Sequence, residues 1–291
     1  MEPPNPTPDK RLDLRRGIYV LPSLFTVGTL VCGYYALVST LRGGQLLATG
    51  LGTDHAQAAL ETASLFFDNA ARAIGWAILF DGLDGRIARL TNTASAFGRE
   101  FDSLADVIAF GVAPALLAYV WGVRGVVDAP GGQGLLHLRQ LAWFLTFAFV
   151  ICGAARLARF NIDTVKPTSD RRFFVGMPIP AAAGVVAAVV HWQKQSLSNW
   201  EFAGAWLVVV GLLAFLMVSR MRYWTFKTVN LQKRYSYLGI ILIGLIVGGI
   251  VLYSEPVLLI LALTYGLSGI ILRIISKVRS HPPTPEEVRA A

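Results

Sequence analysis

The sequence is short of charged residues, cysteines and histidines, and each shortage argues against a class of protein. Charged residues make up 15% of the 291 positions, whereas soluble domains carry about 25%. Cys32 and Cys152 both lie inside apolar runs, without the spacing of a disulfide framework or a metal site. The four histidines are scattered, with no two at ligand spacing. We therefore expect neither a soluble domain nor a cysteine- or histidine-based site.

Long apolar runs dominate the sequence instead. Hydrophobic residues make up 54% of the chain, and the mean hydropathy is +0.54. Several runs exceed the roughly 18 residues that indicate a membrane-spanning helix. We expect an all-α, polytopic membrane helical bundle with about eight transmembrane helices. The first helix lacks the features of a cleaved signal peptide and should be retained. The predicted spans are 18–40, 66–90, 97–122, 138–160, 177–193, 202–219, 236–253 and 256–276.

Lysines and arginines fall mainly on one side of these predicted spans. Arg42, Arg124, Arg139 and Lys194 lie in loops opposite the N-terminus, and most of the others lie in loops or helix ends on the N-terminal side. Because cytoplasmic loops carry the excess of positive charge, both termini are expected in the cytoplasm. The net charge of +8 belongs to these loops. No separate basic patch with interleaved aromatic residues indicates a nucleic-acid partner.

Four aspartates stand at the ends of the second and third predicted helices. A charged residue at the bilayer centre costs about 2.5–3.5 kcal/mol, so four neighbouring carboxylates call for a counter-charge. Divalent cations that prefer oxygen ligands are suited to this. At about 100° per residue, Asp81 and Asp84 share one face of their helix. Asp102 and Asp106 lie one turn apart on the next helix. Two helices would thus present paired carboxylates to each other.

Small residues accompany the aspartates. Gly85, Ala88 and Gly98 leave space for a ligand beside the carboxylates. Arg89 follows at the cytoplasmic end, where a phosphate could reach it. The alternative is that the aspartates are solvated at the membrane surface and pair with nearby arginines. The helical spacing and the small residues favour a site over that alternative.

The pattern Asp-x-x-Asp-Gly-x-x-Ala-Arg, then eight residues, then Gly-x-x-x-Asp-x-x-x-Asp, resembles the signature of the CDP-alcohol phosphatidyltransferases at every defined position. The resemblance implies the fold of that family, a homodimer, and a cavity that opens to the cytoplasm. It implies two divalent cations, Mg²⁺ or Mn²⁺, held by Asp81, Asp84, Asp102 and Asp106, with Asp106 as the general base. Its remaining positions would line the CDP site, namely Gly85, Ala88, Arg89 and Gly98.

Three further segments, 21–33, 152–161 and 176–184, resemble the integral membrane phosphatidylserine synthases within that family, and 220–227 does so more weakly. This implies that CDP-diacylglycerol is the donor and that L-serine is the acceptor, giving phosphatidylserine and CMP. Arg156 and Arg159 are three positions apart and could grip the serine carboxylate, while Asn161 could orient its amino group or hydroxyl. The alternative is that both arginines are anchors at the lipid headgroups.

Two other functions stay open at this point. The same chemistry could use glycerol 3-phosphate, inositol phosphate or choline as acceptor, and intramembrane aspartates also occur in divalent-cation transporters. The expected location is the cytoplasmic (inner) membrane, with the active site facing the cytoplasm. We expect four regions: an N-terminal cytoplasmic arm (1–17) that could form an interfacial helix, a catalytic core (18–228), a C-terminal transmembrane helix pair (229–279) and a flexible tail (280–291).

Overall fold

The computed structural model describes most of the chain, as seven segments. These are residues 10–50, 56–91, 96–128, 135–165, 173–219, 221–224 and 236–279. The predicted tail lies outside the described residues, and so does most of the predicted N-terminal arm.

Helices form nearly all of the described chain, as the sequence predicts. The elements are α1 (Lys10–Gly50), α2 (Ala56–Thr91), α3 (Ala96–Asp106), η1 (Val107–Val112), α4 (Ala113–Tyr119), η2 (Val120–Arg124), α5 (Gly125–Val127), α6 (Leu136–Val165), β1 (Phe173–Val175), α7 (Ile179–Gln193), α8 (Trp200–Val218), β2 (Arg222–Trp224), α9 (Ser236–Leu252) and α10 (Ser254–Arg279). The elements η1 and η2 are π-helical turns, so the chain from α3 to α5 is one continuous helical run. Each predicted span falls within one helix or within this run, to within two residues.

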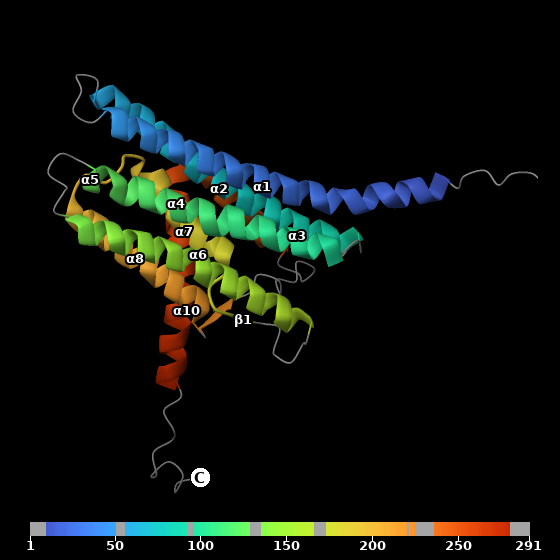
Figure 1. The fold of residues 1–291 in the computed structure, drawn as a ribbon. Helices are drawn as coiled ribbons and strands as arrows, with labels where there is room; N and C mark the ends of the chain where they lie inside the picture. The colour runs from blue at the N-terminus through green and yellow to red at the C-terminus, as the bar shows by residue number, and fades with distance from the viewer. Residues whose placement is uncertain are drawn as a thin grey trace, which may run out of the picture.

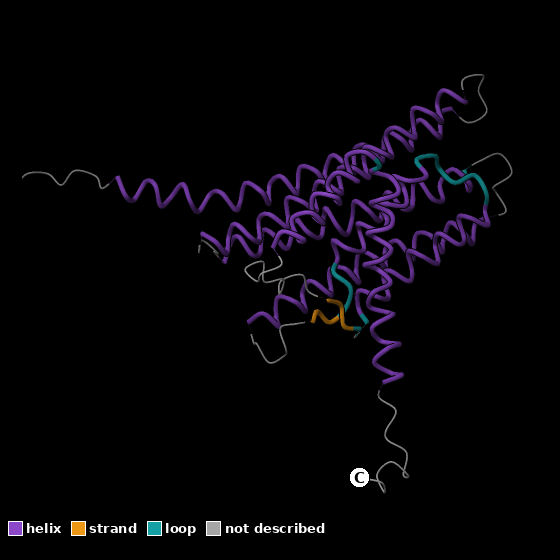
Figure 2. The backbone as a smooth tube through the Cα atoms, turned by 180° about the vertical axis from the view of Figure 1, so that it is seen from behind, coloured by secondary structure: helices purple, strands orange, loops and turns teal. Residues whose placement is uncertain are grey.

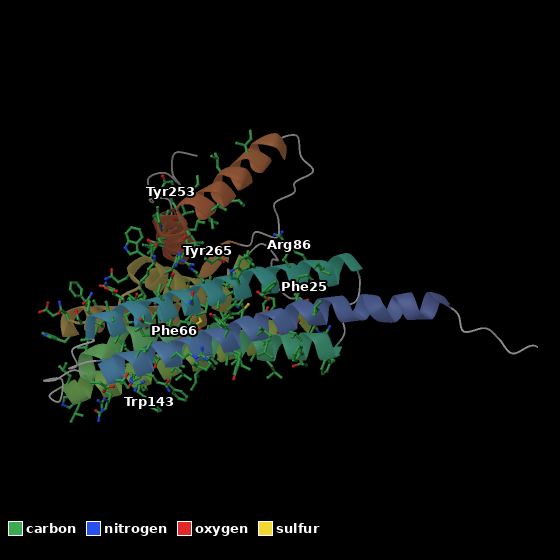
Figure 3. All side chains as sticks on the ribbon, turned by 90° about the horizontal axis from the view of Figure 1, so that it is seen from above. Phe25, Phe66, Arg86, Trp143, Tyr253 and Tyr265 are labelled. Carbon is green, nitrogen blue, oxygen red and sulfur yellow. The ribbon has the colours of Figure 1, made fainter. Side chains whose placement is uncertain are left out.

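Successive long helices run back and forth along the bundle (Figure 1). Helix α2 therefore ends, and α3 begins, at the same end of the molecule, which we call the α2–α3 end. Helix α10 is different, because it runs steeply across the direction of α1 and α6 in Figure 1 and is seen nearly end-on in Figure 3. The α2–α3 end gathers residues from several helices that are far apart in the sequence.

Small residues let α1 approach its neighbours closely. A Cβ atom added to Gly33 would lie 2.8 Å from the Cα atom of Ala109, so α1 touches the backbone of η1 there. At Gly43 an added Cβ would lie 2.8 Å from the ring of Phe67 on α2. Contacts between small residues and neighbouring backbones are typical of membrane helix packing, because lipid supplies no hydrophobic force between helices. The core between the helices contains buried Phe67, Phe110 and Phe149.

Two three-residue strands, which the sequence did not predict, interrupt the helices. Strands β1 and β2 pair antiparallel, with Phe174 opposite Tyr223 (Figure 2). Just after β1, Gly176 adopts a positive φ of 84°, and an added Cβ would lie 2.4 Å from the carbonyl oxygen of Met217. Only glycine fits a backbone of this kind at such a distance. This turn joins the start of α7 to the end of α8 through the hydrogen bond from the Met177 nitrogen to the Leu216 oxygen, at 3.1 Å.

The outer surface of the bundle is apolar, as lipid contact requires. Large side chains such as Leu65, Trp143 and Val208 are more than 60% exposed, a pattern typical of a membrane protein and not of a soluble monomer. Among the described residues, four helical segments are long and apolar enough to cross a bilayer: Leu24–Gly50, Ala96–Val127, Leu136–Ile162 and Trp200–Val218. The chain is therefore an integral membrane protein, and the predicted number of about eight spans stays a prediction.

Candidate active site

The aspartates of the motif come from helix ends that meet at the α2–α3 end. Asp81 and Asp84 lie near the end of α2, and Asp102 and Asp106 lie on the short helix α3. Asp106 is the last residue of α3 and directly precedes the π-helical turn η1. Turns of this kind are frequent at functional sites. In Figure 3, Phe25 of α1 and Arg86 of α2 mark this region, while Phe66 and Trp143 lie toward the opposite end.

Three of the four aspartates form one cluster. Asp81, Asp102 and Asp106 each offer a carboxylate oxygen, and these three oxygens lie within 4.8 Å of one another. Asp106 is buried, with 7% of its surface exposed, whereas the other two are half-buried. The Oδ1 atom of Asp106 is also buried and accepts no hydrogen bond from the described residues. A buried carboxylate oxygen of this kind is costly unless something else binds it.

The fourth aspartate is held by a different contact. Asp84 is buried, and its Oδ2 accepts a hydrogen bond from the hydroxyl of Thr26, a buried residue of α1. Asp84 is thus outside the group of three, on the same face of α2. Thr26 is not among the site residues predicted from the sequence. The available signal was a single hydroxyl in an apolar segment, which does not reveal its partner 58 positions away.

Among the described residues, Arg156 is the buried cation beside this cluster. It lies on α6, is only 7% exposed, and interacts electrostatically with Asp106 and with Tyr265 of α10. Its guanidinium carbon also lies 5.9 Å from the centre of the Phe160 ring. Within the described part of the chain, one buried arginine beside several carboxylates leaves the cluster with excess negative charge.

The other two predicted acceptor residues have different surroundings. Arg159 is exposed, and its Nη1 donates to the carbonyl oxygen of Val218 at 3.5 Å, at the end of α8. The Nδ2 atom of Asn161 donates to the hydroxyl of Ser103 at 2.8 Å. Ser103 follows Asp102 directly, so Asn161 ties α6 to the helix that carries two of the aspartates. The structure therefore brings Arg156 to the cluster, but it does not place Arg159 beside Arg156 in the interior.

The predicted CDP-binding residues line the neighbouring surface as far as they are described. Gly85 on α2 is exposed and Gly98 on α3 is half-buried, so both backbones remain accessible near the aspartates. The side chains of Ala88 and Arg89 lie outside the described part of the chain. Their role in nucleotide binding stays a prediction.

The cluster suits a hard divalent cation. Its donors are all carboxylate oxygens, which Mg²⁺ and Mn²⁺ prefer over nitrogen or sulfur. The donor oxygens are close enough for one ion to bridge them, and Asp106 has a buried oxygen that needs a partner. A metal ion would supply the positive charge that the described residues around the three carboxylates lack.

A second buried polar cluster, which the sequence did not predict, lies nearer the start of α2. Asp68 accepts a hydrogen bond or ion pair from Nδ1 of His191 on α7 and from Nη2 of Arg72, the latter at 2.8 Å. The Nε2 atom of His191 lies 3.0 Å from the hydroxyl oxygen of Ser254, the first residue of α10. No local sequence signal joins these residues, because His191 is 123 positions from Asp68.

Comparison with known proteins agrees with the residue pattern. A model of the CDP-alcohol phosphatidyltransferase family matches residues 19–204, a region that contains all four aspartates and Arg156.

Individual relatives extend this likeness over most of the chain. The chain is 37% identical over 230 residues to CDP-diacylglycerol–serine O-phosphatidyltransferase of Helicobacter pylori (strain ATCC 700392 / 26695), covering 79% of this chain and 82% of that protein. It is 34% identical over 203 residues to the protein of the same name in Methanocaldococcus jannaschii, covering 70% and 83%. A protein of that name in Saccharomyces cerevisiae is 34% identical over 170 residues, or 57% of this chain and 51% of that protein.

Proposed function

Because the chain belongs to the CDP-alcohol phosphatidyltransferase family, we propose that it transfers a phosphatidyl group from CDP-diacylglycerol to L-serine. It is an enzyme of the phosphotransferase type, and the proteins it resembles carry the name of the serine-specific reaction. The observation that carries the proposal is the cluster of Asp81, Asp102 and Asp106 beside the buried Arg156. It combines a diphosphate-binding metal site with a cation for the carboxylate of an amino acid.

The reaction requires one bond to form and one to break at phosphorus. The serine hydroxyl oxygen attacks the phosphorus that carries the diacylglycerol, and the bond from that phosphorus to the CMP oxygen breaks. The proton of the hydroxyl must leave as the new bond forms. We propose that Asp106 accepts it, since it is a buried carboxylate with one oxygen that the described residues leave without a donor. The products are phosphatidylserine and CMP.

We propose that the four aspartates hold two divalent cations, Mg²⁺ or Mn²⁺. Asp81, Asp102 and Asp106 would supply carboxylate ligands, and Asp84 would add a carboxylate that Thr26 contacts. When bound, such ions neutralise the charge of the diphosphate and of the departing CMP. The protein's own part is to fix the carboxylates before the substrates arrive, because helix ends position them more rigidly than loops would.

Arg156 is proposed to orient the acceptor. A guanidinium group binds a carboxylate through two parallel hydrogen bonds, which fixes direction as well as position. Arg156 and Asp106 interact electrostatically with each other. A serine whose carboxylate is bound to Arg156 would therefore present its hydroxyl toward Asp106. Arg159 and Asn161 stay candidate acceptor residues at the same end of α6, with Asn161 also holding α3 through Ser103.

The proposed surroundings follow the family. We propose a homodimer in the cytoplasmic membrane, with both termini and the active site on the cytoplasmic side. A cation transporter would need a metal site that both sides of the membrane can reach. The aspartates cluster at one end of the bundle instead, which supports the enzyme over the transporter.

The test is an acceptor screen on the purified protein. With CDP-diacylglycerol and Mn²⁺ or Mg²⁺, labelled L-serine should yield labelled lipid together with an equal amount of CMP. Glycerol 3-phosphate, inositol phosphate and choline should yield little. Product with one of these acceptors and none with serine would reject serine while leaving the family chemistry intact. Metal transport into proteoliposomes without any CDP-lipid, and no lipid product, would reject the enzyme altogether.

A further inference from the structure

Helix α10 lies outside the region that matches the family model, yet it borders the active site. The match ends at residue 204, and α10 begins at Ser254. A Cβ atom added to Gly266 of α10 would lie 3.7 Å from Cε of Met177, just before α7. On the other side, a Cβ added to Gly153 of α6 would lie 2.6 Å from Cδ1 of Ile179, the first residue of α7. Helices α6 and α10 therefore pack against the same short segment.

Two polar side chains sit close to this shared segment. Arg156 follows Gly153 by three residues, and Tyr265 directly precedes Gly266. Tyr265 is half-buried, packs against the hydrophobic core, and interacts electrostatically with Arg156. Arg156 in turn interacts with Asp106. Tyr265, Arg156 and Asp106 thus form a series of interacting side chains that connects α10 to the aspartate cluster.

We propose that Tyr265 binds the acceptor, its hydroxyl contacting the serine carboxylate that Arg156 holds. The inference rests on the proposed function and adds a specificity residue to it. A neutral phenol can donate one hydrogen bond to a carboxylate oxygen, and its ring supplies an apolar wall. The serine carboxylate would then accept hydrogen bonds from two side chains, the guanidinium of Arg156 and the phenol of Tyr265. An acceptor without a carboxylate, such as ethanolamine, forms neither of these two contacts, so the pair of residues favours serine.

The position of Tyr265 fits a role in choosing the acceptor. The family model describes the part that its members share, and this part contains the four aspartates. A residue that distinguishes serine from other alcohols need not belong to the shared part. Tyr265 is outside it in sequence but reaches the same site through the packing of α10 on α7.

The experiment compares Tyr265→Phe with Tyr253→Phe as the control. Phenylalanine keeps the ring and its packing, so the Tyr265 variant should fold and unfold at the same temperature as the wild type. Tyr253 directly precedes α10, 12 positions before Tyr265, and is 68% exposed, so it is a solvent- or lipid-facing tyrosine next to the same helix. A hydrogen bond to a charged group is lost only in the Tyr265 variant, and the KM for serine should rise about tenfold or more. The KM for CDP-diacylglycerol and kcat should change less than twofold, and the control should match the wild type.

Two further measurements separate binding from a structural role. L-Serine should raise the unfolding temperature of the wild type more than that of Tyr265→Phe, because a ligand stabilises the state that binds it. The preference for serine over ethanolamine should fall in the same variant. An unchanged KM for serine, or an equal rise in the KM for both substrates, would overturn the inference while leaving the proposed reaction standing. Failure of the wild type to use serine would overturn the proposed function and this inference together.

Discussion

Helix α2 carries three acidic side chains that are buried or half-buried, and two of them, Asp68 and Asp81, have opposite surroundings. Asp68 contacts Arg72 and His191, and the imidazole of His191 contacts Ser254 in turn. Asp81 lies 13 positions later, about 20 Å along the helix at 1.5 Å per residue. It faces Asp102 and Asp106, with Arg156 as the neighbouring cation.

The difference separates a structural cluster from a binding site. Where the chain itself supplies the partners of a buried acid, the acid holds helices together, here α2, α7 and α10. Removing one partner then leaves the remaining buried groups uncompensated, which destabilises the fold. Where several carboxylates face one another, their negative charges repel. A ligand that supplies positive charge then stabilises the cluster. The two clusters should therefore respond in opposite ways to mutation and to metal ions.

The largest expected effect is on catalysis in the aspartate cluster. Asp106→Asn keeps the shape of the side chain but removes the proposed base and a metal ligand. General-base catalysis contributes about 10²–10⁴-fold, so we expect phosphatidylserine formation to fall at least about a thousandfold. The unfolding temperature should stay the same or rise, because one repelling charge is gone. Radiolabelled serine incorporation and thermal unfolding in detergent give both numbers, and activity near the wild-type level would refute the role of Asp106.

The second effect is on stability, in the Asp68 cluster. Asp68→Asn removes the acid that pairs with the buried His191 and with the exposed Arg72, and a buried polar group that loses its partner costs about 1–3 kcal/mol. The acid and the histidine are both nearly inaccessible, with 4% and 3% of their surfaces exposed. We expect a lower unfolding temperature and lower yield, but normal activity per folded molecule.

A matched control for this variant is Asp128→Asn. Asp128 pairs with Arg124 and Arg139 at the surface, at 3.2 and 2.7 Å, and surface pairs contribute about 1 kcal/mol or less. Equal loss of stability in the two variants would show that burial does not distinguish the Asp68 cluster.

The third effect is the response to metal. If the aspartates bind Mn²⁺, the ion should stabilise the folded protein by about 2.7 kcal/mol when its concentration is 100 times the Kd. We expect Mn²⁺ to raise the unfolding temperature of the wild type and of Asp68→Asn, and EDTA to reverse this. The Asp81→Asn variant should respond much less. A loss of the Mn²⁺ response in Asp68→Asn, with Asp81→Asn unaffected, would exchange the roles of the two clusters.

The smallest effect is at the end of the structural cluster. Ser254→Ala removes one hydrogen-bonding partner of His191, and we expect a loss of about 0.5–1.5 kcal/mol in the free energy of unfolding. Ser64→Ala is the control, since Ser64 is on α2 and its exposed hydroxyl bonds only within its own helix, to the Glu61 oxygen at 2.7 Å. Chemical denaturation should separate the two variants. Equal stability would mean that the serine does not help to hold α10.

Local features of the chain were predictable from the sequence. Long apolar runs gave the positions of the helices, because a backbone in lipid must satisfy its hydrogen bonds within the same segment. The spacing of Asp102 and Asp106 placed both on one face of a helix, and three of the four aspartates do meet across α2 and α3. The sequence also offered Arg156 as a candidate acceptor residue, but it did not distinguish this from an anchor at the lipid headgroups, and only the structure places Arg156 beside Asp106.

Contacts between distant helices were not predictable in the same way. Thr26 meets Asp84 across 58 positions and His191 meets Asp68 across 123, and neither pair leaves a periodic trace. Arg159 shares a helix end with Arg156, yet it contacts Val218 of α8 at the surface. The two short strands and the positive φ of Gly176 also depend on where α8 ends relative to α7.

By itself, the sequence determined the chemistry of the side chains and the helices that carry them, since hydropathy and helical period are properties of neighbouring residues. Only the tertiary structure decided which acids are neutralised by the chain and which are left for a ligand, because that depends on what other helices place opposite each carboxylate. The packing of α10 on α7 is the clearest case, since it brings Ser254 to His191 and Tyr265 to Arg156.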